Sequence, residues 1–223
     1  MIFGSISYLN LLPFQVYLKK YLNSTQQKQM LKWHKGVPAS INKKLKKAKV
    51  NSAFISIVYA KNFSCVDLGI VANGAVFSVF VIPNQKESLE FDTSSASSNI
   101  LAKILGLKGE VIIGDRALKY YLEGGAGIDL SFEWKKRFNL PFVFARLCYN
   151  KKGKKIKKLI KNFKARSWKI PYYILKKEAK KRGITPKELK WYLQFINYEI
   201  NYKEKKSIKI FQKKAKRFLK EIK

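Results

Sequence analysis

The chain has 223 residues, 47% of them apolar and 14% aromatic, which is enough to bury a substantial core and too apolar for a disordered protein. Its 47 Lys and Arg against 14 Asp and Glu give a formal net charge of +33, which directs attention to nucleic acid or an anionic membrane surface as a partner. No apolar run approaches the roughly 20 residues of a membrane-spanning helix, and the opening MIFGSISYLN lacks the features of a secretory signal, so we expect a cytoplasmic protein.

The first 82 residues alternate strand-like and helical segments. Apolar runs at 2–9, 52–57 and 65–83 are typical of buried strands, whereas 14–23 and 39–50 have helical spacing. Pro38 stands near the start of the second helix, where its missing N–H costs nothing, and we expect this helix to run through Leu45. This order predicts an α/β fold.

The middle of the chain continues the α/β order but differs in charge. A polar loop at 84–99 leads into a helix over 99–107, a strand over 110–115, helices over 116–122 and 130–138, and a strand over 141–149. Residues 83–134 hold 8 acidic and 5 basic residues, whereas 146–223 hold 28 basic and 5 acidic ones. We therefore predict one lobe from residues 1–82 and 147–223 and a second from 83–146, joined by two crossing segments.

From Lys151 onward the pattern is helical, with helices expected to start near Lys154, Pro171, Pro186 and Ser207. Gly183 ends one of them, and Thr185 caps the next. The lysines of this region alternate with apolar residues at helical spacing, which indicates solvated faces of amphipathic helices. The aromatic residues fall at core positions, unlike the exposed aromatics of a nucleic-acid binder; they are Trp191, Tyr192, Phe195, Phe211 and Phe218.

Several residue types that often carry chemistry have an ordinary structural interpretation here. Cys65 and Cys148 lie far apart and near no second ligand pair, so we expect two buried free cysteines and neither a disulfide framework nor a zinc site. His34 has no partner for a metal. The glycines at 124–127 follow a helix and indicate a turn, because a phosphate-binding loop lies between a strand and a helix.

Two polar segments are candidates for a binding site. DTSSASSN has five hydroxyl residues in the six positions 93–98 and ends where an apolar helix begins, so its hydroxyls and backbone N–H groups form an anion cradle or, alternatively, an ordinary helix cap. Asn10 follows the first strand, at a sheet edge where α/β proteins bind ligands, although Asn before a helix is also a common cap.

The segments GSISYLNLLPF, GVPASINKKL, FISIVYA, GAVFSVFV, SSASSNILAKIL, IGDRAL and DLSFEWKKRFNLPFVFA occur in the order seen in the chorismate dehydratases of menaquinone biosynthesis. The chain resembles that family over at least residues 3–147. The resemblance implies a two-lobed α/β fold of the periplasmic-binding-protein type II kind with a helical C-terminal region. It also implies conversion of chorismate to 3-[(1-carboxyvinyl)oxy]benzoate and water in the futalosine pathway, with no cofactor and no metal.

The same resemblance assigns the site residues. Asn10 matches the asparagine of the family's YLN motif and Ser78 the serine of its GxVxSV pattern, and these two residues would carry catalysis. Neither is a strong base, so a carboxylate of the substrate itself is the hypothesised proton acceptor.

The substrate-binding residues follow from the neighbouring motifs. Ser97 and Ser98 align with the family's Thr-Ser pair and, with Asn99, would hold a carboxylate at a helix start. Ser7 and Ser56, at the ends of two strands, would line the walls. The partner is therefore a small dianion, with no membrane insertion and no specific nucleic acid.

Two other functions stay open. A non-catalytic solute-binding protein of the same fold would bind the anion without chemistry, and a basic nucleic-acid-binding protein would use the charge instead. The sequence also departs from the family pattern at Val58, where an acidic residue is common, and at Arg146, which replaces an apolar residue and which we expect at the hinge surface.

Overall fold

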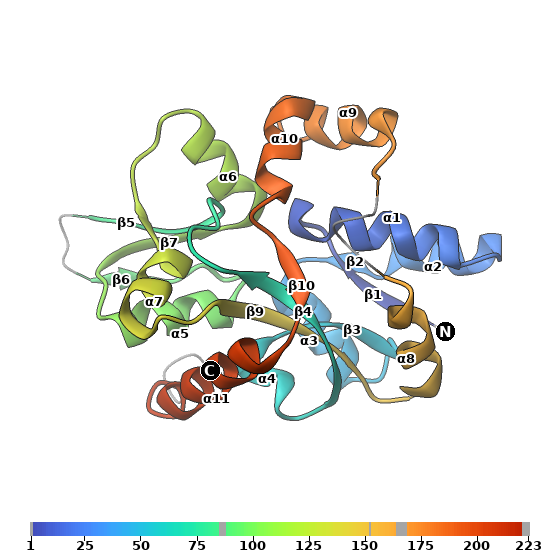
Figure 1. Ribbon diagram of the computed structural model, residues 1–223, viewed down its shortest axis with the longest axis horizontal. Helices are drawn as coiled ribbons and strands as arrows, with labels where there is room; N and C mark the ends of the chain where they lie inside the picture. Colours follow the sequence, from blue (N-terminus) through green and yellow to red (C-terminus); the bar gives the residue numbers. More distant parts are fainter. Residues whose placement is uncertain (1, 85–87, 152, 164–168, 220–223) are drawn as a thin grey trace.

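The computed structural model describes residues 2–84, 88–151, 153–163 and 169–219. The part of the loop after Pro83 that spans residues 85–87 lies outside this description. The remaining chain forms a mixed α/β structure with two separate sheets, as predicted (Figure 1). The strands Phe3–Ile6 and Ser52–Ser56 are buried along their whole length, whereas the two-residue strands at the sheet edges have no buried residue; these are Lys35–Gly36, Leu89–Glu90 and Ile128–Asp129.

The larger sheet has the strand order β10-β4-β9-β3-β1-β2. Its strands are β1 (Phe3–Ile6), β2 (Lys35–Gly36), β3 (Ser52–Ser56), β4 (Ser64–Ala72), β9 (Phe142–Tyr149) and β10 (Asn197–Glu199). β1 pairs in parallel with β2 and β3, whereas β9 runs antiparallel between β3 and β4. The carboxyl ends of β1 and β3 therefore meet at one edge of the sheet.

The smaller sheet has the order β6-β7-β5-β8. Its strands are β5 (Val79–Ile82), β6 (Leu89–Glu90), β7 (Gly109–Ile113) and β8 (Ile128–Asp129). The apolar run expected as one strand over 65–83 is thus divided between β4 in one sheet and β5 in the other. Gly74 at φ +125° and Phe77 at φ +57° lie in the turn between them, where the chain changes direction.

Helices cover both sheets. The helices that lie between or after strands of the larger sheet in the chain are η1 (Leu9–Leu11), α1 (Leu12–Tyr21), α2 (Thr25–Trp33), α3 (Pro38–Lys46), α4 (Ile57–Ala60) and α8 (Gly153–Lys161). The second sheet packs against α5 (Ala96–Leu105), α6 (Gly114–Leu122) and α7 (Leu130–Phe138). The C-terminal region contributes α9 (Tyr172–Lys180), α10 (Pro186–Leu193) and α11 (Tyr202–Ala215).

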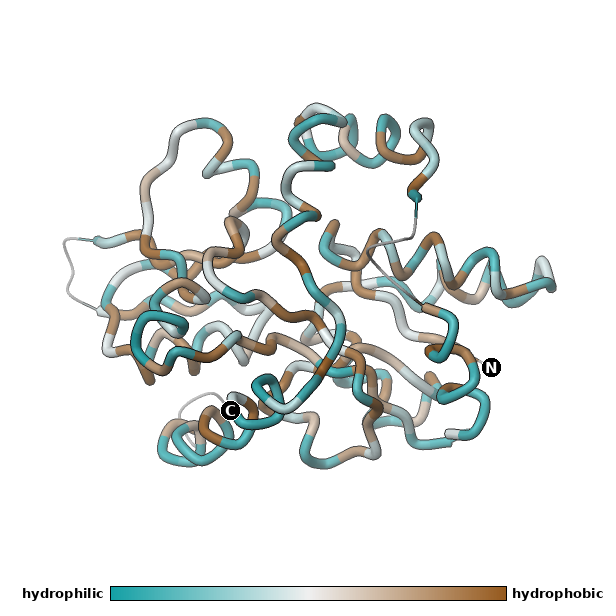
Figure 2. Tube along the Cα trace, viewed as in Figure 1, coloured by the Kyte–Doolittle hydropathy of each residue, from teal (hydrophilic) through white to brown (hydrophobic). Residues whose placement is uncertain are grey.

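One apolar core extends through both halves of the molecule. Trp134 of α7 is fully buried, and its indole packs edge-on against Phe142 of β9 and Phe211 of α11 at ring distances of 5.3 and 6.0 Å. Its Nε1 donates to the Ser207 hydroxyl at 2.9 Å. Figure 2 shows the central strands as largely hydrophobic and the outer helices as alternating in hydropathy.

The lysine-rich helices are amphipathic, as predicted. Ile156 and Leu159 are the buried residues of α8, whereas all of its lysines are exposed. In the C-terminal region none of the five predicted core aromatics is exposed, and Tyr192 and Phe211 are fully buried. The N-cap predicted at Thr185 is confirmed. It is half of a capping box, in which the side chain of Glu188 accepts a hydrogen bond from the Thr185 N–H.

Three further expectations from the sequence were wrong. Cys65 and Cys148 form a disulfide, because β4 and β9 pair antiparallel with these two residues directly opposite each other. β10 interrupts the region expected to be wholly helical, because residues 197–199 pair with β4. The last helix starts at Tyr202, not near Ser207, since Asn201 and Glu204 form a capping box there.

Among the described residues, no helix is both long enough and apolar enough to cross a bilayer.

Candidate functional site

Residues from both sheets line one cavity. From the larger sheet and its helices come Ile6, Tyr8, Asn10, Pro38, Ser56, Ile70, Phe144 and Ala145, and from the other half come Val76, Ser78, Val79, Ser95, Ser98, Ile113 and Gly114. Four of the site residues predicted from the sequence therefore meet in this cavity, although they lie far apart in the chain; they are Asn10, Ser56, Ser78 and Ser98.

Asn10 enters the cavity from η1, the short turn after β1. The Asn10 side-chain oxygen Oδ1 is buried and accepts no hydrogen bond from any residue the structure describes. Its backbone carbonyl accepts a hydrogen bond from the hydroxyl of Tyr198. A buried oxygen without a protein partner is costly unless a ligand supplies a donor, so Asn10 Oδ1 is suited to accept from a substrate hydroxyl.

Ser78 lies just before β5 and is 1% exposed. The hydroxyl of Tyr192 donates to Ser78 Oγ at 2.9 Å, and the Ser78 carbonyl accepts from the Gly114 N–H at 2.8 Å. The turn that precedes Ser78 is held by Asp129, whose Oδ2 accepts from the N–H groups of Val76 and Phe77, both at 2.8 Å. Ser78 is thus fixed from its side chain, its backbone and the preceding turn.

Ser56 ends β3 on the opposite wall. Asn42 of α3 holds it at two points: Asn42 Nδ2 donates to Ser56 Oγ at 3.0 Å, and the Ser56 N–H donates to Asn42 Oδ1 at 3.2 Å. Both residues are buried. Because the amide of Asn42 occupies one side of the Ser56 hydroxyl, the hydroxyl proton is free to point into the cavity.

The N-terminus of α5 faces the same cavity. Ser95 is the N-cap, and its Oγ accepts from the Ser98 N–H at 3.3 Å and lies 3.0 Å from Ser98 Oγ. Both side chains line the cavity. The first N–H groups of a helix lack intrahelical partners and carry partial positive charge, so this terminus suits a carboxylate.

The remaining sequence-based candidates lie outside the cavity lining. Ser97 is buried outside the lining, and its Oγ accepts a hydrogen bond from the Val58 N–H at an N···O distance of 3.5 Å. The Asn99 side chain binds the backbone of Asp92. Ser7 contributes backbone groups, since its N–H donates to the Gly36 carbonyl at 2.9 Å.

An ionic network behind the cavity ties the Ser7–Asn10 segment to α6. Asp115 Oδ1 accepts from the Leu9 N–H at 2.8 Å, and Oδ2 accepts from Arg182 Nε at 2.9 Å. Arg182 also donates to the Ser7 carbonyl at 2.9 Å and pairs with Glu178. This network joins the two halves of the molecule and the C-terminal region behind the cavity.

Burial and local charge shift the titration of this network. Burial raises the pKa of the Asp115 carboxyl, and the Leu9 N–H and Arg182 oppose that shift. Burial alone would also raise the pKa of Glu178, but hydrogen bonds and charges from Lys181 and Arg182 hold it below its ordinary value.

The cavity itself is lined by neutral groups. None of the described lining residues is a Lys, Arg, His, Asp or Glu. Burial raises the pKa of Tyr8, the one lining phenol, so it stays protonated at neutral pH. Binding of an anion here would therefore rely on hydroxyl, amide and backbone N–H donors.

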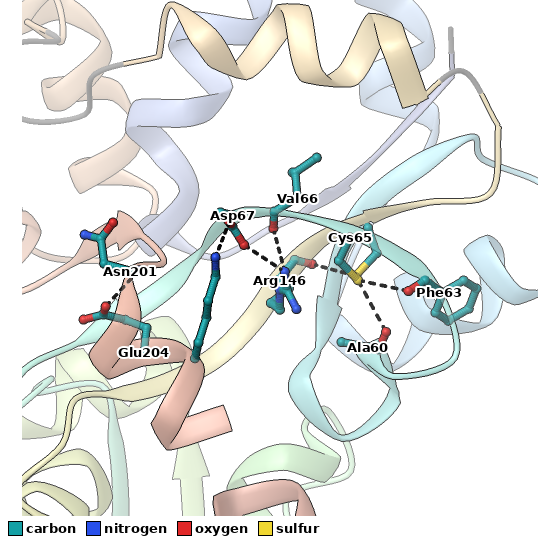
Figure 3. A network of polar contacts seen from close by, with 10 residues as sticks. Ala60, Phe63, Cys65, Val66, Asp67, Arg146, Asn201 and Glu204 are labelled. Atoms are coloured by element: carbon teal, nitrogen blue, oxygen red, sulfur yellow. Dashed lines mark hydrogen bonds and ion pairs between the residues drawn. A yellow bond between two sulfur atoms is a disulfide. The ribbon is translucent and has the colours of Figure 1, made fainter. Parts of the chain in front are cut away.

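Arg146, which we expect at the hinge surface, lies outside this lining, and its side chain is 22% exposed. Its guanidinium donates to the Val66 carbonyl and to Asp67 Oδ1, both at 3.2 Å, and Asp67 also pairs with Lys205 at 2.6 Å (Figure 3). The Cys65 disulfide lies on the same two strands (Figure 3). These contacts join β4, β9 and α11.

Comparison with known proteins identifies relatives along the whole chain. A family model described as menaquinone biosynthesis matches residues 1–109 and 105–217. A chorismate dehydratase of Campylobacter jejuni subsp. jejuni serotype O:23/36 (strain 81-176) is 44% identical over 220 residues, which cover 97% of this chain and 98% of that protein.

Solved structures share the fold at low sequence identity. A protein of Archaeoglobus fulgidus superposes with a TM-score of 0.66 at 13% identity, over 96% of both chains. The periplasmic aliphatic sulphonate binding protein of Escherichia coli superposes with a TM-score of 0.52 at 13% identity, over 99% of this chain and 88% of that one. These matches confirm the predicted periplasmic-binding-protein-like architecture.

Proposed function

The chain belongs to the menaquinone biosynthesis family, and from this premise we propose that it is a chorismate dehydratase, a hydro-lyase that converts chorismate to 3-[(1-carboxyvinyl)oxy]benzoate and water. The support is the 44% identity to a chorismate dehydratase over nearly the full length of both chains. The observation that carries the proposal in the structure is the meeting of Asn10, Ser56 and Ser78 in one neutral cavity.

The proposed reaction is an elimination on the ring of chorismate. A C–H bond breaks at the carbon that bears the enolpyruvyl ether, the C–O bond of the neighbouring hydroxyl breaks, and the electron pair of the C–H bond forms the last double bond of the benzene ring. The proton and the hydroxide leave as one water. Because aromatisation drives the reaction, the protein needs mainly to orient the ring and stabilise the departing oxygen.

The cavity offers a group for each of these tasks. Asn10 Oδ1 would accept a hydrogen bond from the ring hydroxyl and fix its direction, and Ser78 Oγ would donate to the developing negative charge. The α5 N-terminus with Ser95 and Ser98 would hold one carboxylate, and Ser56 would contact the opposite side of the ring. We propose a carboxylate of the substrate as the proton acceptor, since the described cavity lining contains no carboxylate or imidazole.

Ser97, Asn99 and Ser7 have indirect roles in this proposal. Ser97 would fix the start of α5 against the Val58 N–H, and Asn99 would fix the loop at Asp92. Ser7 would act through its backbone, which holds the Asn10 segment on Gly36 and Arg182.

We further propose a cytoplasmic location for the protein. We also propose two lobes, 1–82 with 147–223 and 83–146, that close on the substrate.

Kinetics of two variants test the assignment. Asn10→Ala and Ser78→Ala should each lower kcat by about 10²–10³, the usual cost of removing one preorganised group that acts in the transition state. KM should change much less, because uniform binding contacts are not the main loss. His34→Ala is the matched control, since His34 lies outside the cavity lining, and it should keep parental kinetics. Parental kcat in both site variants would refute the assignment.

A solute-binding protein is the competing proposal, favoured by the structural similarity to a sulphonate binding protein. The same assay separates the two. Chorismate binding without any turnover supports the solute-binding function, whereas formation of the aromatic product supports the enzyme.

A further inference from the structure

Two tyrosine hydroxyls from one short C-terminal segment reach the two proposed catalytic residues. Tyr192 of α10 donates to Ser78 Oγ at 2.9 Å, and Tyr198 of β10 donates to the Asn10 carbonyl. The tyrosines are 2% and 3% exposed, and neither lines the cavity. They therefore lie directly behind the residues that would touch the substrate.

The segment that carries them is held firmly at both ends. The Thr185–Glu188 capping box fixes the start of α10, and β10 pairs with β4, with Asn197 opposite Val71. The ring of Tyr198 packs edge-on against Phe163 at 5.5 Å. In Figure 1 this part of the chain runs through the middle of the molecule, from α10 at the top to β10 in the larger sheet.

The hydrogen bond from Tyr192 determines what the Ser78 hydroxyl can do. A serine hydroxyl has one proton and accepts through its lone pairs. When Tyr192 occupies the acceptor side, the Ser78 proton is directed away from Tyr192 and is available to a substrate oxygen. Burial raises the pKa of Tyr192 and of Tyr198 well above the ordinary value, so both phenols stay protonated as donors.

Tyr198 acts on Asn10 through the backbone. Its hydroxyl bonds to the carbonyl of Asn10 within η1, which fixes the turn from which the side chain projects. Because the Asn10 side-chain oxygen has no protein partner among the described residues, its direction depends on this turn.

We propose that Tyr192 and Tyr198 are positioning residues that set the direction of the Ser78 hydroxyl and the Asn10 amide, so that one C-terminal segment aligns the two groups on the substrate. This inference rests on the proposed function, because it gives each tyrosine a role only through a residue of that site. Of these two tyrosines, only Tyr192 was expected from the sequence to be a core residue. Both rings are buried, and both hydroxyls reach residues of the proposed site.

Double-mutant cycles with chorismate as substrate test the proposal. Tyr192→Phe and Tyr198→Phe keep the rings and remove one hydroxyl each, so the fold should persist. Each should lower kcat about tenfold with KM changed less than about threefold, since the lost hydrogen bond is felt mainly in the transition state. Tyr120→Phe is the control, because its hydroxyl also donates to a backbone carbonyl, that of Ala126, but away from the site; it should keep parental kcat.

The cycles distinguish positioning from a purely structural role. In a Ser78→Ala background, Tyr192→Phe should have no further effect on kcat, and the same should hold for Tyr198→Phe in an Asn10→Ala background. A tyrosine substitution that still lowers kcat tenfold in the Ser78→Ala or Asn10→Ala background would overturn this inference and leave the proposed function intact. Parental kcat in the single tyrosine variants, while Ser78→Ala and Asn10→Ala are impaired, would do the same. Parental kcat in Ser78→Ala and Asn10→Ala would instead remove the site assignment.

Discussion

The carboxylate of Asp129 makes four hydrogen bonds at once, and replacing it with an amide should be strongly destabilising. Oδ2 accepts from Val76 and Phe77, both at 2.8 Å, and Oδ1 accepts from Ser131 and Phe132 at 2.9 and 3.0 Å. One oxygen thus fixes the turn before Ser78 and the other caps α7. In Asp129→Asn a single oxygen remains, and the Nδ2 group faces two N–H donors.

The magnitude follows from the two hydrogen bonds that the amide does not make. A hydrogen bond to a charged group contributes roughly 1.5–3 kcal/mol, so the free energy of unfolding should fall by about 3–6 kcal/mol. Urea denaturation at pH 7 measures this change directly. Asp67→Asn is the control, because Asp67 is half exposed and its ion pairs lie at the surface; its loss should stay near or below about 1 kcal/mol. A loss of less than about 1 kcal/mol in Asp129→Asn would show that the second carboxylate oxygen contributes little to stability.

Two further predictions concern residues in or next to the site. Glu178→Gln should lower the free energy of unfolding by about 1–2 kcal/mol at pH 7. Cationic partners, including Arg182, overcome the effect of burial and hold the pKa of Glu178 below its ordinary value. The stabilising contribution of Glu178 is therefore present above the unfolded-state pKa and is lost as pH falls through the lower folded-state pKa. Denaturation between pH 3 and 7 should therefore show the two proteins converging on acidification, and a constant difference would contradict this. Gly114→Ala should cost more stability than Gly106→Ala. Both glycines have φ near +70°, so the backbone strain is similar, but a Cβ at Gly114 would lie 2.6 Å from the Tyr8 ring whereas Gly106 faces open space. Equal losses on urea denaturation would show that the contact with Tyr8 is unimportant.

Local patterns predicted most helices and strands because each is encoded within its own segment. The helix from Pro38 and the capping of α10 at Thr185 follow from neighbouring residues alone. β10 was not predictable in this way, because a three-residue strand exists only through its pairing with β4. The pairing of Cys65 with Cys148 likewise depends on the register of β4 against β9, which residue spacing does not give.

The candidate site divides along the same line. Asn10 and Ser56 follow or end predicted strands, so their place at a sheet edge could be predicted. Ser78 was assigned from the family motif alone, because it fell inside the strand expected over 65–83. Tyr192 could be predicted only as a buried residue, because helical spacing gives burial but not the partner of a hydroxyl. The aspartate in IGDRAL offered a signal for Asp115, since a carboxylate after a buried strand needs a partner.

Incubation of the purified protein with chorismate, followed by ultraviolet absorbance and mass spectrometry, tests whether the protein dehydrates chorismate. We expect an aromatic product lighter than chorismate by one water, formed in proportion to enzyme and with a sharply lower rate for Ser78→Ala. Absence of any new aromatic product with natively folded protein, at enzyme concentrations approaching that of chorismate, would contradict it.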